Sequence, residues 1–123
     1  MELTYQQKIA IMRILLDIIH ADGIIDAREI YFFGQLKKEF GLSEKDHKVV
    51  KAKNSLVALS QVRLLTEEQK KYLATLMSKM IIVDEDINTN ETAIYEIVAE
   101  FCGINLAFED SIDRDVIEEC SKS

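Results

Sequence analysis

The stretch DGIIDARE, residues 22–29, decides how this 123-residue chain folds. It follows a segment whose few polar residues recur at helical spacing, which predicts a largely buried helix over about residues 4–21. The Asp-Gly pair then breaks that helix. Asp26, followed three positions later by Glu29, forms a capping-box pattern, so a second helix is predicted from there to about residue 40.

A second version of this turn, DEDINTNE, lies at residues 84–91. An offset of 62 aligns residues 8–42 with residues 70–104 without a gap, and six of the aligned pairs are identical. Half of these identities lie at positions that begin or end helices, namely Asp22/Asp84, Glu29/Glu91 and Gly41/Gly103. Apolar positions are also kept, so we expect two helix–turn–helix units related by a pseudo-twofold axis.

The composition favours a single compact all-α domain over residues 1–123. Hydrophobic residues make up 48% of the chain, and proline and tryptophan are absent, which is typical of helix packing rather than of a β-sandwich. Further helices are predicted over about residues 44–53, 55–62 and 67–83, each after an N-cap residue: Ser43, then Asn54 or Ser55, and then Thr66, which forms a capping-box pattern with Gln69. An acidic last helix is predicted between residues 105 and 120.

Several features predict a cytoplasmic protein. The most apolar segment, residues 9–19, is interrupted by Arg13 and Asp17, so no transmembrane segment is expected. Cys102 and Cys120 form no CxxC pair and follow no secretory leader, which favours free thiols in a reducing compartment. The formal net charge of −7 argues against nucleic-acid binding, because a phosphate backbone repels acidic surface.

The first acidic turn matches the second half of a calcium-binding EF-hand loop, with its glycine, isoleucine and glutamate at the expected spacing. The first half is missing, because the positions that would supply the first oxygen ligands hold Ile18 and His20. A standard calcium loop is therefore excluded.

Two interpretations of the turns remain. In the first, which the pattern favours, Glu29 shares a helix face with Phe33, points toward the core and accepts a hydrogen bond from the backbone N–H of the capping residue. Ile25 and Ile87 are then apolar side chains that anchor the two turns. This interpretation needs no cofactor. In the second, residues of both turns gather around the pseudo-twofold axis and hold a divalent cation: Asp22, Asp26, Glu29, Asp84, Asn88 and Glu91.

The charges are unevenly distributed along the chain. Residues 37–71 carry a net charge of +4, and residues 84–123 carry a net charge of −10. Two regions of opposite charge favour docking of a protein partner or head-to-tail self-association. The alternative is that both regions are ordinary charged faces in contact with solvent. The candidate protein-binding residues are basic in the first region and acidic in the second: Lys45, Lys48, Lys51, Lys53, Glu109, Asp110, Asp113, Glu118 and Glu119.

An enzymatic role would require the turn acids to act as general acid and base, or to hold a catalytic metal, on a concave surface. His20 and His47 are the only histidines, and neither has a nucleophile at a recognisable turn beside it. Both are expected to be exposed, solvated side chains. We therefore expect a protein that is not an enzyme.

The chain resembles the TerB-like family of tellurite-resistance proteins. The resemblance rests on the DGIIDARE turn, on the Gly-Leu-Ser at residues 41–43 and on LTEEQKK, residues 65–71, and it covers nearly the whole chain. It implies an all-helical fold of about seven helices with internal pseudo-symmetry, and turn acids that are candidate metal ligands. It also implies a bacterial binding or scaffold module, without catalytic activity, in a stress-response or membrane-proximal complex. Its protein partners, some membrane-associated, would then act in trans.

Overall fold

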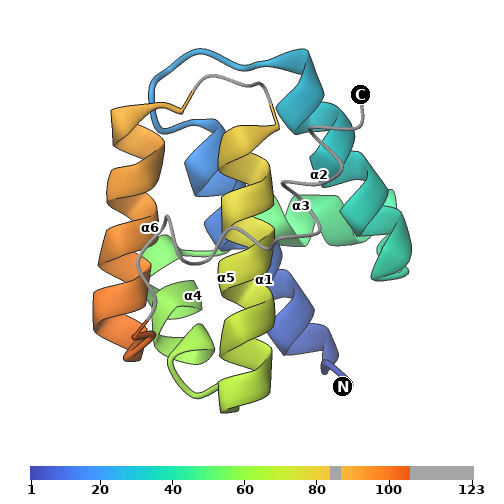
Figure 1. Ribbon diagram of the computed structural model, residues 1–123. Helices are drawn as coiled ribbons and strands as arrows, with labels where there is room; N and C mark the ends of the chain where they lie inside the picture. Colours follow the sequence, from blue (N-terminus) through green and yellow to red (C-terminus); the bar gives the residue numbers. More distant parts are fainter. Residues whose placement is uncertain (84–86, 106–123) are drawn as a thin grey trace, which may run out of the picture.

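The computed structural model describes residues 1–83 and 87–105, and these residues form six α-helices and no strand (Figure 1). In chain order the helices are α1 (Tyr5–Ile19), α2 (Ala27–Glu39), α3 (Glu44–Ala52), α4 (Ser55–Val62), α5 (Glu67–Ile82) and α6 (Thr89–Cys102). The predicted all-α fold is confirmed, with six helices in the described part of the chain rather than about seven. The acidic helix predicted up to residue 120 lies outside the described residues beyond Asn105. No helix formed by residues 1–83 or 87–105 is long and apolar enough to cross a membrane.

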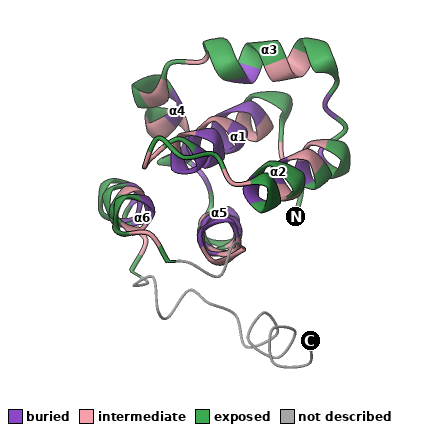
Figure 2. Cartoon of the chain, turned by 90° about the horizontal axis from the view of Figure 1, so that it is seen from above, coloured by how far each residue is buried: buried purple, intermediate pink, exposed green. Residues whose placement is uncertain are grey.

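Helix α1 lies at the centre of the bundle. It packs against each of the other five helices, which Figure 2 shows arranged around it. Nine of its 15 residues are buried, and Leu15, Ile18 and Ile19 have no exposed surface. This central position follows from the sequence, because only a narrow polar stripe interrupts the apolar residues of α1.

The helix pairs α1–α2 and α5–α6 are two copies of one unit, as the offset of 62 predicts. In both copies the glutamate three residues after the N-cap is buried, with 2% of Glu29 and 2% of Glu91 exposed. Each second helix is followed by a glycine with left-handed backbone, Gly41 at φ 70° and Gly103 at φ 72°. Glycine adopts this conformation without the strain that a Cβ would add, so the aligned glycines end both helices, within one residue of the same aligned position.

Helices α3 and α4 connect the two units, and Arg13 of α1 holds their junction. The Arg13 guanidinium donates to the Lys51 carbonyl at 3.0 Å and to Ser55 Oγ at 3.3 Å, and it pairs with Asp17 at 2.7 Å. These charge-assisted bonds fix the α3–α4 corner against the central helix. The start of α4 is thereby positioned alongside α1.

Side-chain caps predicted from the sequence begin α3, α4 and α5. Thr66 and Gln69 form the capping box expected at the start of α5, with hydrogen bonds of 2.9 and 3.1 Å. Ser43, predicted as the N-cap of α3, forms the same reciprocal motif with Asp46. Each box satisfies N–H groups that lack a partner within the helix.

Candidate functional site

The structure brings the first acidic turn, residues 22–29, and the described part of the second, residues 87–91, together at one end of the bundle (Figure 1). Asn88 Nδ2 donates a hydrogen bond to Asp22 Oδ2 at 3.2 Å, although the two residues are 66 positions apart. Asp22 Oδ1 accepts from the Ile24 N–H at 3.0 Å and closes its own turn. Asn88 Oδ1 caps α6 by accepting from the N–H groups of Asn90 and Glu91, at 2.8 and 3.3 Å. One asparagine therefore both starts a helix and ties the two repeats to each other.

The start of α2 differs from the predicted capping box. Asp26 Oδ1 accepts from the Arg28 N–H at 2.7 Å, but among the bonds between described residues Glu29 does not reach back to the Asp26 N–H. The box prediction was wrong here, because the Glu29 carboxylate is turned into the core and cannot also close the turn. Hydrogen bonds from the Arg28 side chain, and then from its N–H, hold the pKa of Asp26 below its ordinary value.

Glu29 and Glu91 are the buried carboxylates of this region. The sequence predicted the inward direction of Glu29 from the helix face that it shares with Phe33, and the structure confirms it. Both glutamates take part in polar or electrostatic interactions within the folded chain. Such partners are what a buried carboxylate requires, so burial alone does not indicate a ligand.

Five of the six predicted metal ligands lie among the described residues, and Asp84 lies outside them. The structure places Asp22 and Asn88 in direct contact. Within residues 1–83 and 87–105, however, no three His, Cys, Asp or Glu side chains are gathered as a metal ion would require. A hard cation needs several convergent oxygens, so these residues by themselves supply only part of a site.

The isoleucines predicted to pin the turns are exposed instead. Ile25 is 54% exposed and Ile87 is 55% exposed, so this prediction was wrong. The ends of α1 and α5 that lead into the turns are already buried, with no exposed surface on Ile19 or Ile81. A close-packed interior leaves no room for further large side chains.

The predicted basic face is present on α3. Lys45, Lys48 and Lys51 are exposed and Lys53 is half-buried, and none of the four pairs with an acid of the described chain. The acidic residues predicted as its counterpart lie outside the described residues: Glu109, Asp110, Asp113, Glu118 and Glu119. The structure therefore presents the basic face alone.

The two histidines differ in their surroundings. His20 is exposed, as expected, but His47 is half-buried and its ring meets Phe33 edge to face at 6.0 Å. Burial lowers the pKa of His47, and the nearby charges of Lys37 and Lys51 add to this effect. The prediction that His47 is an exposed, solvated side chain was wrong, because α3 packs this ring against α2.

A groove between α4 and α6 is the surface feature that sequence reasoning missed. It has a volume of about 230 Å³, and its lining is mostly apolar: Ile14, Leu56, Leu59, Ile94, Ile97 and Val98, together with Asp17 and Ser55. On its opposing walls, Leu56 is 73% exposed and Ile97 is 59% exposed. One signal for it was present in the sequence, since α4 (SLVALSQV) has no charged residue with which to cover a solvent-facing side.

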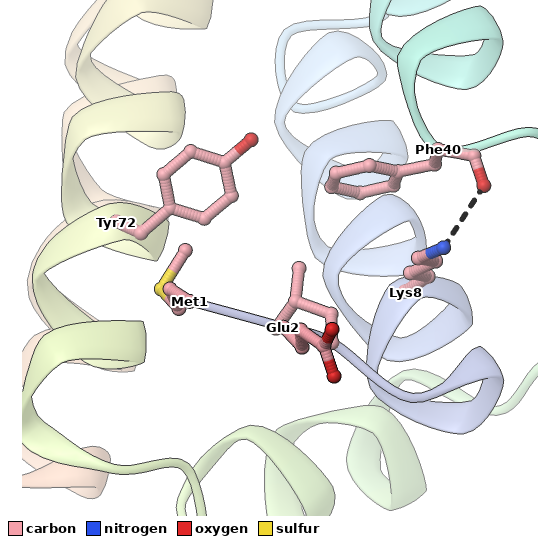
Figure 3. A pocket seen from close by; sticks show the side chains of 6 residues that line it. Met1, Glu2, Lys8, Phe40 and Tyr72 are labelled. Carbon is pink, nitrogen blue, oxygen red and sulfur yellow. Dashed lines mark hydrogen bonds between the residues drawn. The ribbon is translucent and has the colours of Figure 1, made fainter.

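A second hollow lies among the N-terminal residues, the end of α2 and α5 (Figure 3). It has a volume of about 430 Å³ and is lined by Met1, Glu2, Leu3, Lys8, Phe40 and Tyr72. The Lys8 ammonium donates to the Phe40 carbonyl at 3.2 Å and thereby satisfies the end of α2. Burial raises the pKa of Tyr72, and the Glu39 charge adds to this.

Comparison with known proteins supports the fold alone. The chain matches no protein-family model and no curated protein sequence. It is similar to the crystal structure of a protein of unknown function, PG1108 from Porphyromonas gingivalis W83, with a TM-score of 0.74 and 24% sequence identity. The match covers 90% of this chain and 88% of the other.

Proposed function

We propose that this chain is a non-enzymatic protein-binding module that docks a helix of its partner in the groove between α4 and α6. The observation that carries the proposal is the exposure of Leu56 and Ile97, large apolar side chains on opposing walls of one groove. Contiguous exposed apolar surface marks interaction sites in soluble proteins. Complete burial of each side chain is worth about 1.5–3 kcal/mol before the costs of association.

The shape of the groove favours a helical partner. Its walls are two helices that contact each other, and Ile14 of α1 belongs to the lining. A helix that enters such a groove presents apolar residues at i, i+3, i+4 and i+7. A partner strand would instead need an unpaired sheet edge, and residues 1–83 and 87–105 form no strand.

The setting of this module remains a prediction from the resemblance to the TerB-like family. That resemblance supports a cytoplasmic scaffold in a stress-response or membrane-proximal complex, with a role in tellurite resistance as one such context. The exposed lysines of α3, Lys45, Lys48 and Lys51, would offer a second, basic surface to an acidic partner. Self-association through that surface is the alternative use.

A neutral amphipathic peptide of about 16 residues, with leucine at helical spacing and glutamine elsewhere, tests the groove directly. We expect it to bind with a Kd of about 10–100 µM and to shift NMR signals of α4 and α6. Leu56→Ser and Ile97→Ser should each weaken binding about tenfold, because each removes one apolar contact. Val49→Ser is the matched control, since Val49 is also exposed, at 44%, but lies on α3. Equal weakening by all three variants, or no binding at all, would contradict a docking groove.

A second candidate function is divalent-cation binding at the joined turns, and the Asn88–Asp22 contact supports it. Titration with calcium and with magnesium, followed by melting temperature, tests it. A ligand that binds only the native state must stabilise it, and a concentration of 100 times Kd adds about 2.7 kcal/mol. Binding at this site would raise the melting temperature by about 5 °C or more at millimolar metal, and Asp22→Asn would reduce that rise. An unchanged melting temperature in both proteins would remove this candidate.

A further inference from the structure

The chain leaves α6 on the side of α5. Gly103 has left-handed backbone, and the Ile104 N–H donates back to the Ala99 carbonyl at 2.7 Å, so the chain reverses at the end of the helix. Ile104 is half-buried against the core. Together with Asn105 it borders a small hollow at the start of α5, whose other residues are Glu67, Lys70 and Lys71. None of residues 103–105 lines the α4–α6 groove, so the chain departs toward α5 and not along that groove.

The larger hollow among the N-terminal residues, the end of α2 and α5 lies farther along the same direction. Its wall on α5 is Tyr72, the residue directly after Lys71, and its wall on α2 is Phe40, the C-cap of that helix. Figure 3 shows the two rings on opposite sides of the hollow. Figures 1 and 2 both show α5 between α6 and α2. A chain that continues from Asn105 across the first turns of α5 therefore comes to this hollow.

The residues that line this hollow suit an aromatic occupant. Four of the six are apolar or aromatic, namely Met1, Leu3, Phe40 and Tyr72. The other two are one acid and one base, Glu2 and Lys8, so charge does not select the occupant. Aromatic rings attract a further ring in offset or edge-to-face geometry. A volume of about 430 Å³ leaves room for one large side chain between the two rings.

The segment beyond Asn105 carries such a side chain at a suitable distance. Phe108 is the only aromatic residue among residues 106–123. An α-helix with its side chains is about 10–12 Å across, and three residues of extended chain span about 10 Å. Phe108, three residues after Asn105, can therefore reach from one side of α5 to the other, whereas Leu106 is too close to the start of α5.

We propose that the hollow between α2 and α5 is the docking site of this chain's own C-terminal segment, residues 106–123, with Phe108 seated between Phe40 and Tyr72. Docking buries apolar surface of three aromatic rings, which is its driving force. It joins the end of α2 to α5 at the end of the bundle opposite the acidic turns (Figure 1). The hollow shares no lining residue with the α4–α6 groove, so this contact does not depend on a partner helix in that groove.

Limited proteolysis of the full chain tests the docking of this segment. Arg114 is the first trypsin site after Phe108, and its cleavage rate reports the undocked fraction when docking is faster than cleavage. Phe108→Ala should speed this cleavage about tenfold or more, because burial of a phenylalanine side chain changes the docking equilibrium by at least that factor. Tyr72→Ala should have a similar effect although it leaves the segment unchanged. Tyr72→Phe, which keeps the ring, should retain the slow cleavage.

The matched controls are Phe101→Ala and Tyr31→Ala, which remove the same residue types from positions that are 44% and 70% exposed and do not line the hollow. Both should leave cleavage at Arg114 unchanged, and circular dichroism checks that every variant is folded. Equal cleavage rates in the unchanged chain and in Phe108→Ala would overturn the docking of Phe108.

Two further outcomes would assign the segment to another site and overturn the proposal. The first is acceleration of cleavage by Phe108→Ala and by Leu56→Ser but not by Tyr72→Ala, which would place the segment in the α4–α6 groove instead. The second is a cleavage rate that rises when the protein is diluted, which would show that the segment docks on a second copy and not within its own chain. The proposed α4–α6 docking function is tested separately by the leucine–glutamine peptide, whose binding Phe108→Ala should leave unchanged.

Discussion

Leu15→Ala is expected to lower the free energy of unfolding by about 3–4 kcal/mol, a larger loss than any other substitution proposed for this chain. Leu15 has no exposed surface and lies on α1, the helix that contacts all five others. Truncation removes three buried carbons and leaves a cavity that neighbours from several helices cannot fill together, because each is held by its own contacts. Urea unfolding followed by circular dichroism measures the loss as a lower midpoint with an unchanged slope.

Leu64→Ala is the control for this prediction. Leu64 is the same residue type but is 83% exposed, so its truncation should change the free energy of unfolding by less than about 0.5 kcal/mol. A loss of less than about 1.5 kcal/mol for Leu15→Ala would show that α1 is not the closely packed centre of the bundle.

Asn88→Ala is expected to cost about 2–3 kcal/mol, the second largest effect. The change removes two functions of one side chain. The loss of the N-cap, which accepts from two N–H groups of α6, costs about 1 kcal/mol. The hydrogen bond from Asn88 Nδ2 to the Asp22 carboxylate adds about 1–2 kcal/mol, because its acceptor is charged.

Asp26→Ala separates these two functions of Asn88. Asp26 occupies the aligned position in the first repeat and caps α2, but the structure gives it no bond to the other turn among the described residues. We expect its loss to cost only about 1 kcal/mol in thermal or urea unfolding. A double-mutant cycle of Asp22→Ala and Asn88→Ala should give a coupling of about 1 kcal/mol. Equal costs for the two caps, with zero coupling, would show that the contact between the turns adds nothing to stability.

The features that the sequence predicted correctly depend on neighbours along the chain. Capping at Thr66 depends on Gln69, three residues later, and the helix end at Gly103 depends on a local backbone conformation. Helical spacing alone predicted that Glu29 points inward, because it shares a face with Phe33. The repeat was visible because both copies keep these local signals at the same offset.

The features that the sequence did not predict depend on what lies across the bundle. The sequence pattern indicated Asn88 only as a candidate metal ligand, but its Nδ2 bonds Asp22 of the other repeat. Ile25 was expected to be buried, because its residue type favours the core, yet it is 54% exposed. Which exposed surfaces remain apolar likewise depends on which helices meet.

The acidic turns and the α4–α6 groove show this division most clearly. The sequence by itself determined that residues 22–29 and 84–91 separate helices, because capping and helix-breaking act within a few residues. Only the tertiary structure decided that Asp22 and Asn88 of the two turns bond to each other and that Leu56 of α4 and Ile97 of α6 line one groove. The physical reason is that contacts between residues far apart in the chain are set by how the helices pack together, whereas caps and helical faces are set by the local backbone.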